Sequence, residues 1–291
     1  NDISKTEDVV VGQNYDYLST GAVQPLPVMD ITADIYMPDA SVDSDVDRRV
    51  IMYMHSGNFL PPYFNGSYSG TNEDLAIATV CQKYAQRGYV VIAPSYRLGW
   101  NPGSALPELR KGTLLNAAFR AMIDCKTTVR YLRKSVAEDG DPYGIDDTKI
   151  GVGGQGTGGY MVHAYRSLNK NMEAYSDARF MDPLNPGYSY IDTLMYGTDG
   201  EAGPNSLNYH LENHMNYSSD VNVFFNYGGA LIDTAWLEAG EGPCISVQTI
   251  LDPNAPFGQD MLIVPTTGEN VLRADGINVH CAKTRDLGEN D

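Results

Sequence analysis

A cluster of glycines between an apolar run and a helical pattern constrains the fold of this chain more than any other stretch. Residues 149–160 read KIGVGGQGTGGY, and the residues before and after the glycines predict a strand and a helix. Because glycine has no side chain, Gly154, Gly158 and Gly159 allow the strand and the helix to approach closely. The stretch therefore predicts a tight strand-to-helix turn with Gly156 at its apex.

Apolar runs and helical patterns alternate along much of the chain. Continuous apolar runs at 50–54 and 89–94 are typical of buried central strands. Helices are expected at 73–87, which Gly88 ends, and at 115–136, where apolar residues recur at helical spacing. Strands that alternate with helices predict an α/β fold with a mainly parallel sheet covered by helices on both faces.

The remaining segments complete this predicted fold. Alternating apolar positions at 28–37 indicate antiparallel N-terminal strands, and the last clear strands are expected at 221–225 and 245–250. Residues 172–220 are rich in Tyr, Asn, Gly and Pro and have weak periodicity, which predicts an excursion over the sheet, with a lid as one form of it. We expect residues 1–291 to form a single domain.

The chain is strongly acidic. Its 37 Asp and Glu residues against 20 Lys and Arg residues give a formal net charge of −17. Such a chain repels phosphate backbones and anionic lipid surfaces, so we expect no nucleic-acid partner. No apolar run in the sequence approaches the length of a membrane span, so we expect none.

Several features together predict an extracellular, secreted protein. The chain starts at Asn1 without an initiator Met, which suits either a mature form that has lost a signal peptide or a recombinant form. The four cysteines form an even set. We expect one disulfide between Cys81 and Cys125, with buried thiols as the alternative, and a second between Cys244 and Cys281.

The glycine turn also carries a catalytic pattern. Residues 154–158, GQGTG, have the outline of a G-x-S-x-G nucleophile elbow, with Gly156 where the serine would be. The chain from about residue 30 to residue 280 resembles the carboxylesterase and lipase group of the α/β-hydrolase fold. MHSGNF at 54–59 is similar to the family's HGGGF oxyanion loop, and GYVVIAPSYRLGW at 88–100 is similar to its strand and turn at the same interval. YGIDDTKIGVGGQGTGG at 143–159 resembles its elbow with the preceding turn and strand, and LDPNAP at 251–256 resembles the loop that carries its triad acid.

The resemblance implies positions for a catalytic triad. Gly156, Asp252 and His280 follow the family order of nucleophile, acid and histidine. In the family a closing helix usually follows the triad histidine, and the segment after His280 is short and polar for such a helix. Either the chain is cut near this point or His280 lies outside the triad position.

The resemblance also implies an oxyanion loop that contains His55, Ser56, Gly57 and Asn58. In such a loop the chain contributes backbone N–H groups, and we expect His55 to hold the loop by hydrogen bonds. The side chain of Thr157 should point away from the cleft, and its backbone N–H is a further candidate oxyanion donor.

Gly156 removes the chemistry that the elbow implies. Glycine cannot attack an acyl carbon. It adopts the positive φ of an elbow without the strain, of about 1–3 kcal/mol, that a residue with a Cβ bears there. A water activated by His280 and Asp252 would have to act without the covalent route. The chain therefore looks like an esterase scaffold without its nucleophile.

No cofactor and no metal site are expected. His210 and His214 are spaced as a metal pair on a helix would be, but no third ligand accompanies them, which favours a solvated face. The acidic groups at 43–47 and 139–147 suggest calcium, but the first lacks the glycine and final glutamate of an EF-hand, and solvated turns are favoured for both. Sequons at Asn65 and Asn216 would be glycan acceptors in a glycosylating organism.

Two hypotheses for function follow. The first is a catalytically silent, carboxylesterase-like secreted protein that acts as a binding or structural module, with self-association or an extracellular partner, and with a small ester ligand if the cleft is open. The alternative is a carboxylic-ester hydrolase in which Gly156 is either an engineered replacement of serine or a natural variant with another mechanism.

Overall fold

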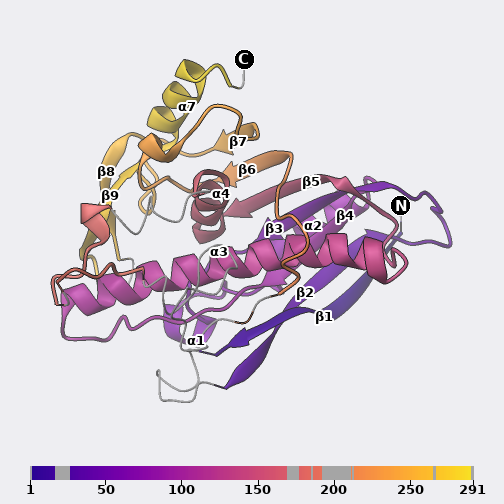
Figure 1. Ribbon diagram of the computed structural model, residues 1–291, viewed down its shortest axis with the longest axis horizontal. Coiled ribbons are helices and arrows are strands. Elements are labelled where there is room, and N and C mark those ends of the chain that lie inside the picture. Colours follow the sequence, from indigo (N-terminus) through magenta and orange to yellow (C-terminus); the bar gives the residue numbers. More distant parts are fainter. Residues whose placement is uncertain are drawn as a thin grey trace.

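A mixed sheet organises the part of the chain that the structure describes (Figure 1). This computed structural model describes residues 2–16, 27–168, 177–184, 186–191, 211, 213–264 and 267–289. Within them the main sheet has seven strands, in the spatial order β1 (Ile3–Tyr15), β2 (Val28–Pro38), β4 (Val90–Ser95), β3 (Arg48–Met54), β5 (Ile145–Gln155), β6 (Val223–Tyr227) and β7 (Cys244–Val247). Strand β2 pairs antiparallel with both β1 and β4, whereas the five strands β4, β3, β5, β6 and β7 run parallel to one another. The predicted α/β class is therefore confirmed, including its antiparallel N-terminal strands.

Strand β3 is buried on both sides, as its continuous apolar run predicts. Successive side chains of a strand point to opposite faces of the sheet. Accordingly Val50, Met52 and Met54 lie in one apolar cluster and Ile51 and Tyr53 in another. Each large side chain buried in this way stabilises the fold by about 1.5–3 kcal/mol.

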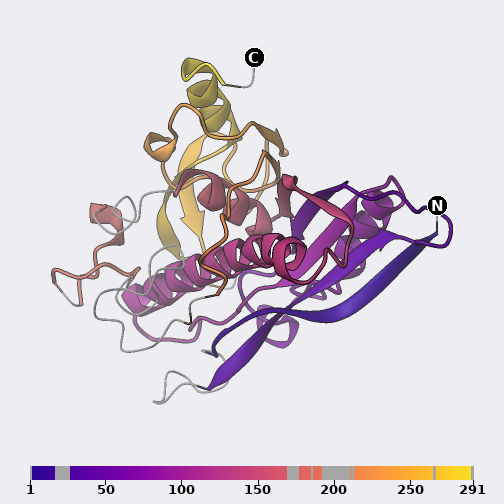
Figure 2. The same ribbon diagram turned by 45° about the vertical axis from the view of Figure 1, so that its right-hand side comes forward.

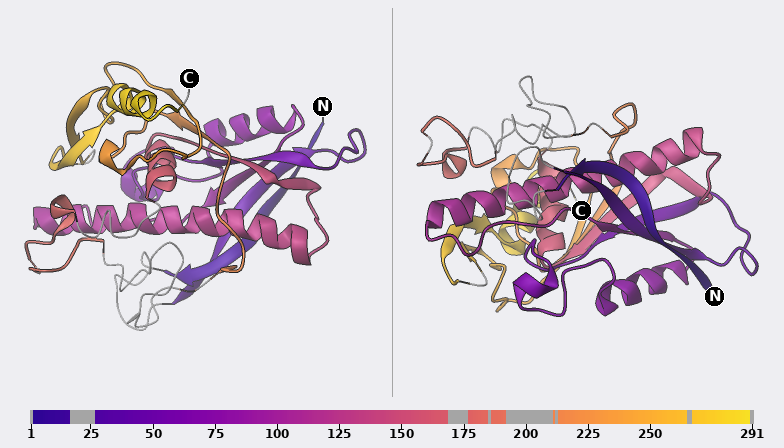
Figure 3. Two further views of the ribbon diagram at one scale, coloured as in Figure 1. Left: turned by 45° about the horizontal axis from the view of Figure 1, so that its top comes forward. Right: turned by 90° about the horizontal axis from the view of Figure 1, so that it is seen from below.

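Helices cover both faces of this sheet. Helix α2 (Leu75–Ala85) packs on β2, β3 and β4, whereas α3 (Pro107–Glu138) packs on β1, β5 and the helix α4 (Thr157–Ser167). Figure 3 shows the strands between α2 and α3. Shorter turns of helix are α1 (Pro62–Asn65), η1 (Ala178–Phe180) and η2 (Thr234–Trp236). None of the helices in the described ranges has both the length and the apolar character that crossing a bilayer requires.

A C-terminal unit stands at one end of the sheet (Figure 2). Strands β8 (Gln259–Ile263) and β9 (Asn270–Asp275) form an antiparallel hairpin, and α7 (Ile277–Asp286) follows it. The sequence suggested that this tail was too short and polar for a closing helix. The structure places His280 inside α7 and not before it, and Ile277, His280 and Thr284 recur at helical spacing and are buried together on one face of that helix.

The predicted disulfides are not formed. Cys81 of α2 belongs to the apolar cluster on one face of the sheet, and Cys125 of α3 belongs to the cluster on the other face. The sheet separates their sulfur atoms, so the two cannot bridge. The structure also holds Cys244 and Cys281 as thiols. Most of the predicted excursion, including residues 192–210, lies outside the described residues.

Candidate active site

The turn between β5 and α4 closes only because Gly154, Gly156 and Gly158 have no side chains. Gly156 has φ = +56° and donates its N–H to the carbonyl of Tyr227 at 2.9 Å. A Cβ on Gly154 would lie 2.5 Å from the backbone of Gly158, and a Cβ on Gly158 would lie 2.4 Å from the carbonyl oxygen of Met54. These separations are shorter than any carbon tolerates, so α4 can approach β3 and β5 only without side chains at 154 and 158.

The space beside Gly156 is occupied by a serine from another strand end. A Cβ at residue 156 would lie 2.2 Å from Oγ of Ser56 and 3.0 Å from its Cβ. The oxyanion loop that residues 54–59 resemble has glycine where this chain has Ser56. The chain therefore carries serine in the loop and glycine at the elbow, and the two positions share one space. A serine at 156 would force the side chain of Ser56 to rotate away.

The hydroxyl of Ser56 also faces the amide expected to stabilise an oxyanion. The N–H of Thr157, the first residue of α4, points at Oγ of Ser56 across 3.4 Å. A helix N-terminus with an N–H directed outward favours a negative charge or an oxygen acceptor. In this structure the acceptor is Oγ of Ser56.

His55 supports the loop from behind. Its ring is 1% exposed and stacks on Tyr96, with ring centroids 4.1 Å apart and an interplanar angle of 5°. The hydroxyl of Tyr96 donates to the carbonyl of His55 at 2.8 Å. Burial lowers the pKa of His55 to about 4, so its imidazole is neutral at pH 7. His55 thus holds the loop, since its Nδ1 also contacts the carbonyl oxygen of Ser56 at 2.5 Å.

Asn65 latches the same loop. Its side-chain N–H groups are shared among the carbonyls of Gly57 at 3.2 Å, Leu60 at 3.0 Å and Ser69 at 2.8 Å. A glycan attached to this nitrogen would break those bonds, so the sequon at Asn65 is a poor acceptor in the folded protein. Asn216, the other sequon, is exposed.

Asp252 and His280, the predicted partners of residue 156, are held in separate places. Asp252 accepts from the N–H groups of Asn254 and Ala255 in its own turn, at 2.8 and 3.0 Å. His280 pairs through Nε2 with Nη1 of Arg166 at 3.0 Å. Arg166 is nine residues past the start of α4, about 14 Å along its axis. The described contacts therefore do not join His280 to Gly156.

A cavity of about 200 Å³ opens beside the elbow. Ser56, Asn58, Gly156, Thr157 and Tyr160 line its polar side. The rest of the wall is apolar and aromatic and includes both tryptophans of the chain: Trp100, Leu115, Ala118, Phe119, Met122, Phe180 and Trp236. Such a wall suits an acyl or aryl group, with the polar groups at one end to orient it.

The other polar groups singled out in the sequence lie in ordinary contacts. His214 pairs with the carbonyl of Val11 at 3.0 Å, and His210 lies outside the described residues. In the two acidic groups, Asp43 pairs with Arg48 at 2.7 Å and Asp139 with Lys134 at 2.8 Å. In both groups, therefore, an aspartate forms an ion pair with a neighbouring basic side chain.

Solved esterases share this fold. The apo form of Thermogutta terrifontis esterase 2 is 17% identical over 98% of this chain and 80% of that chain, with a TM-score of 0.52. The same esterase phosphorylated by paraoxon is 18% identical over 98% of this chain and 79% of that one, with a TM-score of 0.51. Its butyrate-bound form is 18% identical, covers 90% and 76% of the two chains, and has a TM-score of 0.50.

Sequence comparison gives a family. No curated protein matches this chain. The sequence model of the BD-FAE family matches residues 33–185, a range that contains the loop of residues 54–59, the glycine turn and α3. Since this range is more than half of the 291 residues, the chain belongs to the BD-FAE family.

Proposed function

We propose that this chain binds a carboxylic ester in the cavity beside Gly156 and forms no acyl-enzyme at residue 156. One observation carries the proposal: Oγ of Ser56 lies where a side chain at 156 would begin, at 2.2 Å from the Cβ position. An acyl-enzyme at 156 needs an oxygen attached to that residue, and Gly156 has none. The apolar cavity and the loop around it nevertheless keep the form of an ester site.

The occupant follows from the chemistry of the wall. The apolar residues suit a short acyl chain or an aromatic alcohol, whereas the amide of Thr157 and the hydroxyl of Ser56 suit an ester carbonyl. Membership of the BD-FAE family and the likeness to esterases support a carboxylic ester over other apolar ligands.

Ester hydrolysis is the second candidate, and a specific observation favours it. Ser56 is a hydroxyl in the cavity, and it lies beside the oxyanion donor of Thr157. An attack by Ser56 on the ester would give an acyl-Ser56 and release the alcohol, and water would then release the acid. A general base is needed to take the hydroxyl proton. In the described part of the chain, Nδ1 of His55 contacts Ser56 at its carbonyl oxygen, and no histidine ring nitrogen is hydrogen-bonded to its Oγ.

We expect phenyl butyrate to change the intrinsic tryptophan fluorescence, because Trp100 and Trp236 both line the cavity. Ala118 of α3 also faces the cavity, so Ala118→Phe should weaken binding about tenfold or more by filling it. Ala137→Phe is the matched control, since Ala137 is exposed on the same helix and should leave binding unchanged.

Turnover of 4-nitrophenyl butyrate separates the two candidates. Binding without turnover supports the first. Turnover that Ser56→Ala abolishes supports the second, and Ser56→Ala then retains binding. If wild-type protein neither binds nor turns over such esters, the ester proposal is wrong and a structural or self-associating role is left.

A further inference from the structure

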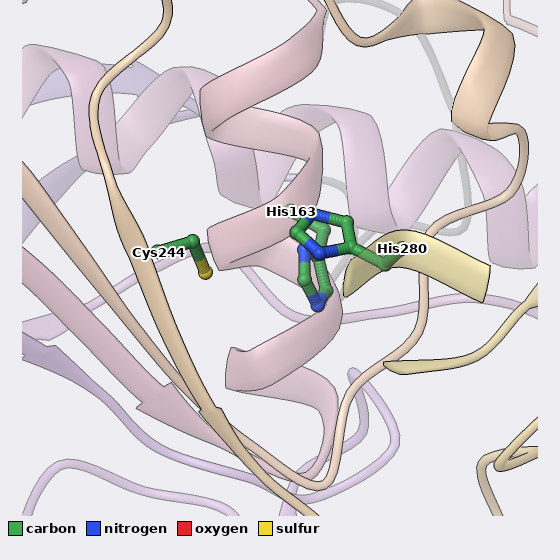
Figure 4. A group of neighbouring side chains, drawn as sticks. All are labelled: His163, Cys244 and His280. Carbon is green, nitrogen blue, oxygen red and sulfur yellow. The ribbon is translucent and has the colours of Figure 1, made fainter. Parts of the chain in front are cut away.

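Two histidines and a cysteine from distant parts of the sequence meet behind the elbow helix. His163 lies on α4, Cys244 begins β7, and His280 lies on α7. Figure 4 shows the three side chains directed toward one another. One ligand atom from each residue lies within 4.8 Å of the others, and the two imidazole rings have centroids 4.4 Å apart. The group lies about two turns along α4 from Gly156, so it is separate from the ester cavity.

The histidines of this group are buried without enough hydrogen bonds. His163 and His280 are each 1% exposed. Among the described residues, neither nitrogen of His163 has a hydrogen-bond partner, and Nδ1 of His280 has none. A buried polar group left without a hydrogen bond destabilises the fold, because it has lost its bonds to water. A single metal ion could be bound by nitrogens of both histidines and by the neighbouring sulfur of Cys244.

Burial is the main cause that raises the pKa of the Cys244 thiol, so a metal ion has to displace the thiol proton when it binds. Burial is the main cause that lowers the pKa of both His163 and His280, so the imidazoles are neutral, which is their ligand form. Arg166 is the nearby positive charge. It pairs with the carboxylate of Glu289 at 2.6 Å, which offsets its charge, and it lies 3.8 Å from Glu241, whose pKa burial raises to about 7.

We propose that His163, Cys244 and His280 bind a Zn²⁺ ion. Two imidazoles and a thiolate form a donor set that zinc prefers, and three protein ligands leave the fourth tetrahedral position for water. In a tetrahedral zinc site neighbouring ligand atoms are about 3.5 Å apart. The present separations, up to 4.8 Å, therefore need to close by about 1 Å, which side-chain rotation can supply.

Binding involves a definite exchange of protons and partners. The Cys244 thiol loses its proton to solvent as the Zn–S bond forms. His280 binds through Nδ1, which leaves the proton on Nε2. The guanidinium of Arg166 must then give up its bond to Nε2 of His280, and it keeps its pair with the carboxylate of Glu289. Zinc would tie α7 and β7 to α4, a cross-link that the predicted disulfide would have supplied in part.

Co²⁺ is the probe for this site, because it takes the place of Zn²⁺ and absorbs light. The chelator-treated full chain should bind one Co²⁺ and develop a thiolate charge-transfer band in the near ultraviolet, which one equivalent of Zn²⁺ removes. Cys244→Ser should lose the band, whereas the matched variant Cys281→Ser should keep it. His163→Gln and His280→Gln should weaken binding at least about tenfold, whereas His214→Gln should not.

Two further readouts do not depend on how the variants fold. Zn²⁺ should protect Cys244 of the wild-type chain from alkylation. Zn²⁺ at 100 times its Kd should also raise Tm by about 5 °C. A wild-type chain without the band and without protection would overturn the proposal. So would a band that survives Cys244→Ser, or one that Cys281→Ser alone removes.

Discussion

Replacing Asp124 with asparagine should lower the free energy of unfolding by about 3–5 kcal/mol. Asp124 is fully buried on α3 and pairs with Arg97, which follows β4 and is 3% exposed. The carboxylate accepts from Nε of Arg97 at 2.9 Å, from Nη2 at 2.8 Å and from its backbone N–H at 2.8 Å. The pair fixes the strand-to-loop corner that leads to Trp100 and the cavity.

The size of this effect comes from the charge left behind. With asparagine at 124 the guanidinium of Arg97 stays buried without the carboxylate that pairs with it here, and an uncompensated buried charge is far more costly than a lost hydrogen bond. Urea unfolding measures the change. Glu7→Gln is the control, because Glu7 is exposed and its pair with Lys5 should contribute less than about 1 kcal/mol. A loss below about 1 kcal/mol for Asp124→Asn would show that the pair does not hold this corner.

Acid should destabilise the folded protein through His55, which lies in the loop of residues 54–59. Burial lowers the pKa of His55 from 6.5 to about 4 in the folded protein. Between these values the unfolded chain takes up a proton that the folded protein does not. Stability from this group is therefore complete above pH 6.5 and is lost as pH falls toward 4, by about 1.4 kcal/mol per pH unit and about 3 kcal/mol in all.

Comparing the wild-type protein with His55→Gln isolates the contribution of this histidine to the free energy of unfolding. Unfolding free energies of wild type and His55→Gln are measured from pH 7.5 to pH 4, and the gap between them should change by about 3 kcal/mol over that range. All other titrating groups contribute equally to both curves. A gap that stays constant with pH would show that His55 titrates alike in the folded and unfolded protein. Carbon-13 NMR of the ring provides the pKa directly.

The elements with strong local patterns were predictable from the sequence. The apolar run at 50–54 predicted β3, and the spacing at 115–136 predicted α3, because each pattern lies within one element. The helix α3 begins earlier, at Pro107, a residue whose fixed φ suits the first turn of a helix. The glycines of residues 154–158 predicted the turn, because the approach of strand to helix needs residues without side chains.

Features made by distant residues were not predictable in the same way. Ser56 and Gly156 are 100 residues apart, and only the folded chain shows that they share one space. Helix α7 is polar along most of its length, so its one buried face did not stand out. The group formed by His163, Cys244 and His280 has no short spacing that a sequence pattern could reveal.

The most direct test is to mix the wild-type chain with 4-nitrophenyl butyrate and follow nitrophenolate release and the intact protein mass together. We expect the ester to be bound, as displacement of phenyl butyrate would report, with no release above buffer and no protein species heavier by one butyryl group. A butyrylated protein, or nitrophenolate release that increases with protein concentration, would contradict the view that Ser56 occupies the space beside Gly156 without acting as a nucleophile.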